Sequence, residues 1–591
     1  MRYLVARVTV FDWSPQAPDR IVYVSTESGV RQVHTLDLES GARRRVTDHP
    51  VGVVDGFATV DGEGVVWFED ESGDESGRWF REPFFGGKKT PLDGFPVGWS
   101  GGLAQAAGIV AAVTSDEQGF GVHIDLEGRG PKEIYRHSEA IGLGSFEKGG
   151  FLRGALSADG GLLCLEHSEH GDLLHPALRV LDTRSGEPVG EQLDGGMALG
   201  AAAWSPLQGD QRLAIAHERD GELRPGIWDV AAGTRSDIEL ELQGLVEVCD
   251  WWPDGGALLM LNLHRGRHRL FRYDLDTGAA TPVESLPGTI SHARVRPDGT
   301  VWYLLSQGHL APKALDESGT EVISLEGEPA PPGRAFHDWS FENPHGQQVE
   351  GFYVTPEGSG PHPVVMLVHG GPTAADIDRW DPEAQAYVDA GFAVGMVNYR
   401  GSIGYGREWR DVLVGDIGGP ELEDVNAGLQ DLVERTKADP GRAVIAGWSW
   451  GGYVTLLELG KHPELWCCGV AGVPIGDYEA SYEDLSPLLK AYDRALLGGT
   501  PSELPQLMQE RNPINFADNV RAPVLFVAGE NDSRCPFRAV MLYVERLKAR
   551  GHPHELYSFS AGHGSFDAEE QVRQMRVVLE FLATHVPAKT S

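Results

Sequence analysis

The sequence is poor in cysteine, lacks any long apolar run and carries far fewer basic than acidic residues. Its 591 residues include 5 cysteines, 50 Lys and Arg, and 87 Asp and Glu, which gives a formal net charge of −37. The cysteines are odd in number and irregularly spaced, so neither a disulfide framework nor a structural zinc site is expected. Free thiols are typical of a reducing compartment, and the sequence therefore predicts a cytoplasmic protein.

These scarcities also restrict the expected partners. A strongly acidic chain repels nucleic acid and anionic membranes, so neither is expected to bind. No stretch reaches the roughly 18 apolar residues that predict a membrane span, and the N-terminus lacks the apolar centre of a secretory signal. With 41% hydrophobic residues the chain can still form packed cores, and its length favours two or more domains.

A short phrase recurs through the first half of the chain, a turn with Pro or Asp-Gly followed by a β-rich run. Its turns fall at Pro15, Val60, Ala158, Pro206, Pro253 and Pro297, with gaps of 45, 98, 48, 47 and 44 residues. The gap of 98 spans two repeats, with a degenerate copy expected near 102–114. Several short strands in each such repeat are typical of propeller blades. The pattern predicts a seven-bladed β-propeller over residues 1–330; an array of β-sandwiches is the alternative.

Beyond a Pro- and Gly-rich segment at 326–334, apolar runs alternate with amphipathic segments. Strands are expected at 362–369, 392–398, 442–447, 467–472, 522–529 and 554–560, and helices at 382–392, 421–437 and 567–585. This alternation is typical of a mostly parallel sheet covered by helices on both faces. Residues 331–591 are therefore predicted to form an α/β domain.

A Gly-x-Ser-x-Gly pentapeptide, Gly447-Trp448-Ser449-Trp450-Gly451, lies between a predicted strand and a predicted helix. Its glycines permit the sharp turn that exposes a nucleophilic serine, and the helix N-terminus favours developing negative charge. An ordinary glycine-rich turn is the plainer alternative. The strand–turn–helix context favours Ser449 as a nucleophile.

Two further turns carry a candidate acid and a candidate base. Asp532 follows the strand at 522–529, and His563 follows the strand at 554–560. A lone Asp would usually be a turn former and a lone His a surface residue, but the order Ser449, Asp532, His563 is that of α/β-hydrolases. The sequence therefore predicts a catalytic triad in which His563 takes the proton of Ser449 and Asp532 orients the imidazole.

The tetrahedral intermediate of acyl transfer needs two N–H donors for its oxyanion. One is expected from the backbone of Trp450, the residue after the nucleophile, and the other from Gly371 in the loop His369-Gly370-Gly371-Pro372. Because the predicted triad is complete, no metal or organic cofactor is expected.

Five phrases together resemble the prolyl oligopeptidase family of serine peptidases, in particular its acylaminoacyl-peptidase-like branch. They are VHGGP (368–372), NYRGSIGYG (398–406), GDIGGPELEDV (415–425), GWSWGGY (447–453) and ENDSRCP (530–536). The resemblance implies the same triad and oxyanion donors, and a propeller that admits only short peptides. It also implies that Arg534 binds a substrate carbonyl on the N-terminal side of the cleaved bond; a structural salt bridge is the alternative role.

The specificity pocket is expected within residues 473–499. Val473, Tyr478, Tyr482, Leu488 and Tyr492 are its candidates, and they suggest an apolar or aromatic residue before the cleaved bond. Packing within a lid or core is the alternative role for these side chains.

Three functions remain open at this point. The first is a serine peptidase that hydrolyses short peptides or aminoacyl amides near their N-terminus, either acylated, as for acylaminoacyl peptidases, or free, as for aminopeptidases and dipeptidyl peptidases. The second is a carboxylesterase with the same triad. The third is a propeller scaffold with an inactive hydrolase domain, which the filled catalytic positions disfavour. Short peptide or aminoacyl-amide substrates are the expected partners, and a homo-oligomer is left open.

Overall fold

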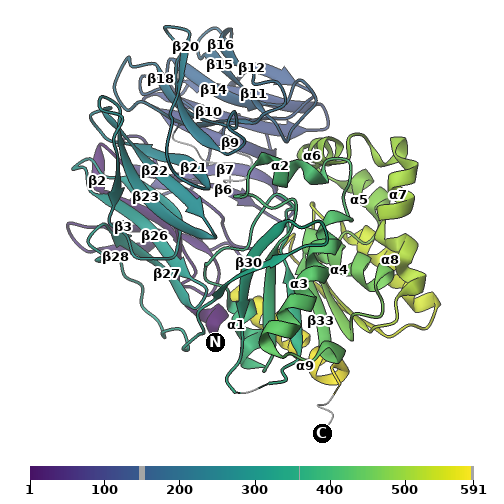
Figure 1. Ribbon diagram of the computed structural model, residues 1–591. Helices are drawn as coiled ribbons and strands as arrows, with labels where there is room; N and C mark the ends of the chain where they lie inside the picture. The colour runs from purple at the N-terminus through teal and green to yellow at the C-terminus, as the bar shows by residue number, and fades with distance from the viewer. Residues whose placement is uncertain (145–153, 359, 588–591) are drawn as a thin grey trace.

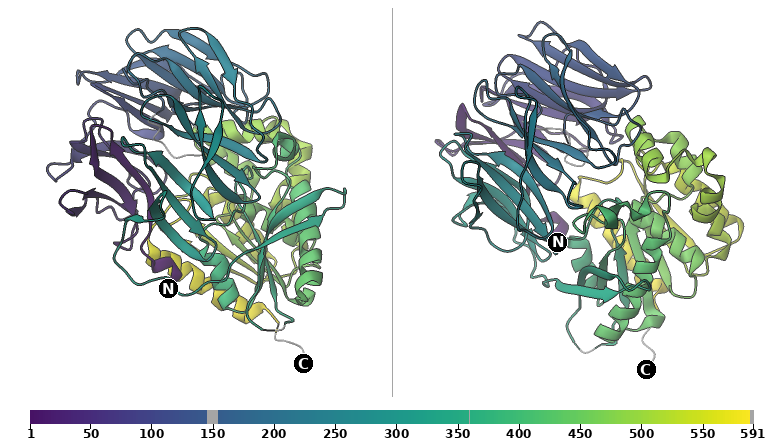
Figure 2. Two further views of the ribbon diagram at one scale, coloured as in Figure 1. Left: turned by 60° about the vertical axis from the view of Figure 1, so that its left-hand side comes forward. Right: turned by 45° about the horizontal axis from the view of Figure 1, so that its top comes forward.

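The computed structural model describes residues 1–144, 154–358 and 360–587, which form two domains (Figure 1). A strand-rich N-terminal domain lies beside a C-terminal domain in which helices surround a sheet, and Figure 2 shows the two domains from two further directions. The predicted fold, a seven-bladed β-propeller followed by an α/β-hydrolase domain, is confirmed.

The described residues of the N-terminal domain form seven antiparallel blades, each a meander of four strands in chain order. Their bounds are β1 (Val8–Ser14), β2 (Ala17–Ser25), β3 (Gln32–Asp37) and β4 (Arg43–Arg45); β5 (Gly56–Ala58), β6 (Gly64–Asp70), β7 (Ser76–Pro83) and β8 (Thr90–Pro91); β9 (Gly98–Ala106), β10 (Ile109–Asp116), β11 (Gly119–Leu126) and β12 (Lys132–His137); β13 (Ile141–Gly142), β14 (Leu162–His167), β15 (Ala177–Asp182) and β16 (Pro188–Gln192); β17 (Leu199–Trp204), β18 (Arg212–His217), β19 (Arg224–Asp229) and β20 (Thr234–Asp237); β21 (Leu245–Trp251), β22 (Ala257–His264), β23 (Arg267–Asp274) and β24 (Ala280–Val283); β25 (Thr289–Val295), β26 (Val301–Gln307), β27 (Leu310–Asp316) and β28 (Glu321–Ile323). The degenerate repeat expected near 102–114 is the β9–β10 hairpin of blade 3.

Blade 1 and blade 7 close the ring through side chains, because every described strand of blade 1 comes from the N-terminus and every described strand of blade 7 from residues 289–323. Trp13 of blade 1 packs edge to face on Trp302 of blade 7, with ring centroids 5.5 Å apart. Arg294 of blade 7 pairs with Asp12 of blade 1. Burial of these faces stabilises the ring where a shared strand would otherwise supply backbone hydrogen bonds.

The C-terminal sheet has eight strands in the order β29-β30-β32-β31-β33-β34-β35-β36. Their bounds are β29 (His337–Glu342), β30 (Gln348–Val354), β31 (Val364–Val368), β32 (Ala393–Asn398), β33 (Ala443–Trp448), β34 (Cys468–Gly472), β35 (Val524–Gly529) and β36 (His554–Phe559). All residues of β31, β32 and β35 are buried, as expected for parallel strands covered on both faces. The antiparallel strands β29 and β30 were not predicted, because exposed polar residues alternate along β29 at the sheet edge.

Helices cover both faces of this sheet. Their bounds are α1 (Pro382–Asp389), α2 (Arg407–Arg410), α3 (Pro420–Thr436), α4 (Trp450–Lys461), α5 (Tyr478–Asp484), α6 (Pro487–Leu497), α7 (Pro505–Arg511), α8 (Phe537–Ala549) and α9 (Ala568–His585). Buried side chains of α1 and α9 share one apolar core, and those of α3, α4 and α8 share the other. The short N-terminal helix η1 (Arg2–Leu4) packs on α9, and Arg2 pairs with Asp389 of α1.

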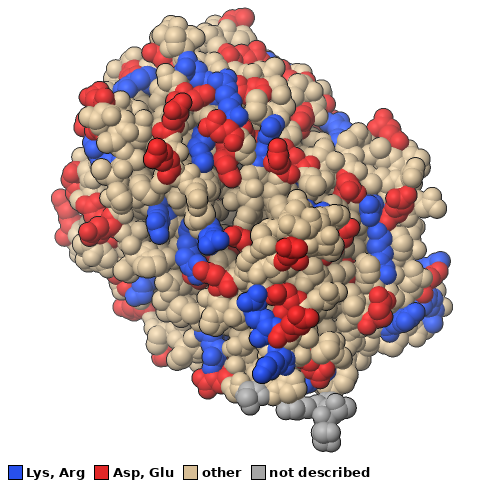
Figure 3. Space-filling model, in the orientation of Figure 1, with Lys and Arg blue, Asp and Glu red and all other residues tan. Residues whose placement is uncertain are grey.

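Three further features concern possible membrane spans, the cysteine thiols and the surface charge. Within residues 1–144, 154–358 and 360–587, no helix is long and apolar enough to cross a membrane. Cys164, Cys467, Cys468 and Cys535 are free thiols. On the face shown in Figure 3, acidic and basic side chains are interspersed, so the negative charge of the chain is not gathered there into one patch.

Candidate active site

Ser449 occupies a strained turn between β33 and α4. Its φ of 59° and ψ of −118° lie in a region that non-glycine residues rarely adopt. A side chain at Gly451 would place its Cβ 2.0 Å from the carbonyl oxygen of Val368, and one at Gly447 would come within 2.5 Å of Gly451. The two glycines are therefore required sterically, because the strand, the turn and the helix crowd together around the serine.

Asp532 and His563 are hydrogen-bonded on adjacent loops, after β35 and after β36. His563 Nδ1 lies 3.0 Å from Oδ1 and 2.9 Å from Oδ2 of Asp532. The backbone N–H groups of Arg534 and Cys535 donate to Asp532 Oδ1 at 2.8 and 2.9 Å. The Asp532 side chain is 1% exposed, so this loop fixes a buried carboxylate against the imidazole.

Ser449 and His563 are not joined by a hydrogen bond in the described part of the chain. Instead, Ser449 Oγ contacts Cys535 Sγ at 4.0 Å, and Cys535 belongs to the loop that carries Asp532. In hydrolases without substrate, the bond between nucleophile and base is often long and tightens when substrate binds. The structure thus brings two of the three predicted residues into contact and places Ser449 on the turn beside them.

The predicted oxyanion loop lies directly against the nucleophile. A Cβ at Gly370 would stand 3.3 Å from Ser449 Cβ and 3.8 Å from Ser449 Oγ. Gly371 is exposed, with a φ of 126° that favours glycine. Trp450 is the first residue of α4, so its N–H belongs to the turn that has no intrahelical acceptor. Both predicted donors are thus at the elbow.

His369 anchors the first end of this loop. Its ring stacks on Tyr399 with centroids 4.2 Å apart, and its Nε2 lies 2.9 Å from Ser402 Oγ. Burial lowers the pKa of His369 to about 4. The imidazole is therefore neutral at physiological pH and serves as a rigid anchor rather than as an acid or base.

Arg534 forms an ion pair with Glu75, a propeller residue in the β6–β7 loop. Arg534 Nε donates to Glu75 Oε1 at 2.7 Å, and Glu75 Oε2 lies 3.3 Å from Ser533 Oγ. The two side chains are 51% and 38% exposed, so the pair remains open to a ligand. Burial lowers and Glu75 raises the pKa of Arg534, with a net upward shift, so the guanidinium stays charged. Sequence reasoning missed Glu75, because it lies 459 residues from Arg534 and belongs to no recognised motif.

The β6–β7 loop also touches both catalytic loops through its backbone. Asn531 Nδ2 donates to the carbonyl of Ser72 at 2.8 Å. A Cβ on Gly562, next to His563, would stand 1.6 Å from the carbonyl oxygen of Gly73. The acid and histidine loops are therefore packed directly against the propeller.

Blade 1 holds the other end of the histidine loop. Arg31 N donates to the carbonyl of Phe566 at 3.2 Å, and Ala568 N donates to the carbonyl of Gly29 at 2.9 Å. The Arg31 guanidinium lies 4.4 Å from the centre of the Phe566 ring. The segment that carries His563 is thus held by the propeller on both sides.

Three of the predicted pocket residues, Val473, Tyr478 and Tyr482, occupy different environments. Val473 lies at the end of β34, beside the elbow, with a φ of 36° and a buried side chain. Tyr478 is fully buried, and its hydroxyl lies 3.3 Å from Asp493 Oδ1. Tyr482 is half-buried on α5. The structure brings neither tyrosine into a hydrogen bond with Ser449 among the residues described, so their role in the pocket stays a prediction.

Within the described ranges, no group of three His, Cys, Asp or Glu side chains is arranged to hold a metal ion. The chemistry that the arrangement supports is nucleophilic attack by Ser449, proton transfer by His563 and stabilisation of an oxyanion by backbone N–H groups.

Comparisons with known proteins extend this geometry. Residues 379–588 match the prolyl oligopeptidase family. The acylamino-acid-releasing enzyme of Rattus norvegicus is 25% identical over 366 residues, which cover 57% of this chain and 50% of that protein. Dipeptidyl aminopeptidase BIII of Pseudoxanthomonas mexicana is 30% identical over 229 residues, or 38% of this chain and 33% of that protein. The chain thus spans about half the length, or less, of these curated relatives.

The fold comparison covers the whole chain. A puromycin-hydrolyzing peptidase of Mycobacterium tuberculosis has a structure that superposes with a TM-score of 0.82, covering 100% of this chain and 96% of that one. At 21% sequence identity, this likeness supports the fold alone. The predicted resemblance is confirmed for the part of the chain that carries Ser449, Asp532 and His563: residues 379–588 form a domain of the prolyl oligopeptidase family.

Proposed function

We propose that this protein is a serine peptidase that hydrolyses short peptides or aminoacyl amides near their N-terminus. One observation carries the proposal: Ser449 sits on a strained strand–helix turn beside a buried, hydrogen-bonded Asp532–His563 pair. That placement exposes a hydroxyl next to a base whose orientation is fixed. The match of residues 379–588 to the prolyl oligopeptidase family supports it.

The reaction proceeds in two steps. His563 Nε2 accepts the proton of Ser449 as Oγ attacks the substrate carbonyl carbon, and the N–H groups of Gly371 and Trp450 donate to the resulting oxyanion. The tetrahedral intermediate collapses, the C–N bond breaks, and the imidazolium protonates the leaving amine. Water, deprotonated by His563, then attacks the acyl-enzyme and releases the acid, which restores the Ser449 hydroxyl.

The position of the propeller supports short substrates. Its β6–β7 loop and blade 1 lie on the loops that carry Asp532 and His563, so a folded chain has no unobstructed approach from that side. An enclosed site also excludes bulk water and strengthens the electrostatic interactions within it. We therefore propose short peptides or aminoacyl amides as substrates, with no nucleic-acid or membrane partner and a cytoplasmic location.

The Arg534–Glu75 pair bears on which N-terminus is recognised. Arg534 has donors beyond those given to Glu75 and can bind the carbonyl of an acylated terminus. Glu75 can bind a free ammonium group at the same place. The pair places a carboxylate and a guanidinium at one position, so a substrate with a free amine can bind Glu75 through its ammonium group while Arg534 binds its carbonyl. Acylated substrates, as the name of the rat relative indicates for that enzyme, are the other candidate.

Fluorophosphonate labelling and amide hydrolysis test the central proposal. The wild type is expected to be labelled at Ser449 and to hydrolyse aminoacyl anilides. Ser449→Ala is expected to abolish labelling and to lower kcat at least about 10,000-fold. Turnover retained in Ser449→Ala contradicts the proposal, and hydrolysis of esters without amides assigns the protein to the carboxylesterases.

Paired substrates test the recognition of the terminus. Glu75→Gln is expected to lower kcat/KM for a phenylalanine anilide about 10- to 100-fold, and to change the acetyl-phenylalanine anilide much less, because only the free amine uses the carboxylate. Glu71→Gln, an exposed position on the same loop, is the matched control and is expected to alter neither. Equal effects of Glu75→Gln on both substrates would exclude amine recognition by Glu75.

A further inference from the structure

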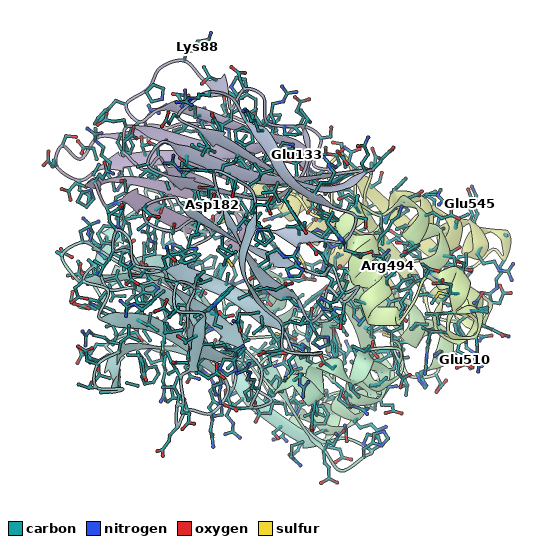
Figure 4. The ribbon with its side chains drawn as sticks, turned by 90° about the horizontal axis from the view of Figure 1, so that it is seen from above. Lys88, Glu133, Asp182, Arg494, Glu510 and Glu545 are labelled. Carbon is teal, nitrogen blue, oxygen red and sulfur yellow. The ribbon has the colours of Figure 1, made fainter. Side chains whose placement is uncertain are left out.

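Helix α6 lies between the propeller and the hydrolase domain. Leu488, Ala491 and Ala495 pack against the apolar core that blades 3 and 4 share. Arg494 pairs with Glu139 of the propeller at 2.5 Å. Figure 4 shows Arg494 where the helices of the hydrolase domain meet the blades, whereas Glu510 and Glu545 lie at the outer edge of that domain. Blades 3 and 4 therefore fix the position of α6.

Tyr492, on the same helix, contacts the rest of the hydrolase domain as well as the propeller. Its ring packs at the edge of both the core of blades 3 and 4 and the main core of the hydrolase domain. Its hydroxyl lies 3.1 Å from Thr373 Oγ1. Thr373 follows the predicted oxyanion donor Gly371 by two residues, so one side chain links α6 to the oxyanion loop.

The segment around Gly371 needs such a link. Gly371 is exposed and has the permissive conformation of a glycine, with a φ of 126°. The loop is fixed before it by His369, through the Tyr399 stack, and after it where Ile403 N donates to the carbonyl of Ala374 at 3.0 Å. An oxyanion donor acts only when it is about 2.7–3.1 Å from the developing charge, so small displacements of this loop weaken catalysis.

We propose that Tyr492 is a positioning residue for the oxyanion donor Gly371, acting through its hydrogen bond to Thr373. The inference rests on the proposed function, since it concerns an intermediate formed on Ser449. In this role Tyr492 acts through Thr373 on a backbone N–H that contacts the oxyanion. Because blades 3 and 4 fix α6, the propeller as well as the hydrolase domain then holds the oxyanion loop in position.

A substrate-binding role for Tyr492 makes a different prediction. A pocket residue contacts substrate in the ground state and in the transition state alike, so its loss raises KM with little change in kcat. A residue that positions an oxyanion donor affects only the transition state, so its loss lowers kcat and leaves KM nearly unchanged.

The test is a double-mutant cycle on Tyr492→Phe and Thr373→Val, with kcat, KM and the affinity of a peptide boronate as readouts. The boronate forms a tetrahedral adduct with Ser449 and senses the oxyanion donors. Each single variant is expected to lower kcat and boronate affinity about 3- to 10-fold, the worth of one hydrogen bond. The double variant is expected to lose no more than either single one. Thr373→Ser, which keeps the hydroxyl, is expected to restore the wild-type values.

Tyr135→Phe is the matched control. Tyr135 packs against the same core of blades 3 and 4, and its hydroxyl donates to Glu169, within the propeller, at 2.5 Å. It is expected to leave kcat and boronate affinity unchanged. A raised KM with unchanged kcat, effects that multiply in the double variant, or an equal effect of Tyr135→Phe would each overturn the inference. If wild-type protein has no amide hydrolysis to begin with, the proposed function itself has failed.

Discussion

The propeller meets the hydrolase domain in two regions with different chemistry. Beside the catalytic loops, contact is made largely by backbone: Gly73 against Gly562, and Gly29 and Arg31 against the segment after His563. On the side of blades 4 and 5 and helix α6, ion pairs join the two domains beside the apolar contacts of α6. We call these the backbone contact and the charged contact. Close backbone packing has no tolerance for added atoms, whereas ion pairs respond to pH and salt.

The charged contact is a network centred on His175 of blade 4. His175 Nδ1 lies 2.7 Å from Asp172 of its own loop, and Nε2 lies 3.0 Å from Asp411 of the hydrolase domain. Arg410 bonds Asp411 at 2.7 Å and also pairs with Glu218 of the propeller. One region of the interface therefore positions the catalytic loops and another attaches the two domains, and mutations can change each region separately.

The largest expected effect comes from adding one carbon to the backbone contact. Gly562→Ala is expected to lower kcat/KM at least about 100-fold, because a Cβ 1.6 Å from the carbonyl oxygen of Gly73 forces the His563 loop to move. Steady-state kinetics on an aminoacyl anilide measure this. Gly564→Ala, whose Cβ would meet nothing within 4 Å, is the control on the same loop. Normal activity in Gly562→Ala would show that the backbone contact does not position the histidine.

Breaking the charged contact is expected to affect stability more than catalysis. Glu218→Gln removes one of the two carboxylate partners of Arg410, whose side chain is 14% exposed, and leaves it paired with Asp411 alone, so the free energy of unfolding should fall by about 1–3 kcal/mol. Denaturant titration checks this, with kcat expected within about 2-fold of wild type. Asp518→Asn removes the exposed partner of Arg546 and should cost less than about 1 kcal/mol. A loss of kcat that matches Gly562→Ala would erase the distinction between the two contacts.

The charged contact should also weaken at alkaline pH. Burial opposes protonation of His175, but the carboxylates of Asp172 and Asp411 outweigh it and raise its pKa to about 9. His170, which lies 2.9 Å from the His175 carbonyl, and Arg410 complete the charged surroundings. A raised folded-state pKa gives a stabilisation that is complete below the unfolded-state value of about 6.5 and is lost as pH rises through about 9.

His175→Gln tests this sign. The wild type is expected to unfold at a higher temperature than the variant at pH 6, by an amount that corresponds to about 1–3 kcal/mol. The difference should shrink as pH rises through about 9, the pKa of His175, because both proteins then lack the positive charge. If the unfolding temperatures of the two proteins differ by the same amount at every pH in this range, His175 does not act as a charged bridge.

The smallest expected effect is on the ion pair between Arg494 of α6 and Glu139 of the propeller. Glu139→Gln removes the partner of Arg494, but the side chains are 23% and 37% exposed, so the change should be below about 1 kcal/mol. The effect should fall further in high salt, because exposed charges are screened. If the same denaturant titration gives a loss of unfolding free energy that does not change with salt, this ion pair is shielded from solvent like those around Arg410.

Much of the fold could be predicted because its signals are local. The spacing from Pro15 to Pro297 located the blades, including the degenerate copy that forms the β9–β10 hairpin. Continuous apolar runs located the buried parallel strands. The antiparallel pair β29 and β30 escaped detection, because an edge strand with exposed polar residues resembles a loop in sequence.

The candidate site divides in the same way. Ser449, Asp532 and His563 each follow a strand within one domain, so a motif and a chain order were enough to predict them. The contacts of Glu75 and Tyr492 could not be predicted, because an ion pair across 459 residues, or a hydrogen bond from α6 to Thr373, leaves no periodic or local signal in the sequence. Cys535 stood within a quoted phrase, yet its contact with Ser449 Oγ depends on how two loops pack.

The sequence by itself thus determined which side chains can take part in the reaction, since strand ends and glycine turns depend on residues that are neighbours in sequence. Only the tertiary structure decided which contacts hold these side chains in position. The placement of Gly73 on Gly562, of Glu75 on Arg534 and of His175 between two carboxylates arises where separately folded surfaces meet. Contacts of that kind depend on shape and charge across distant segments, which no single stretch of residues specifies.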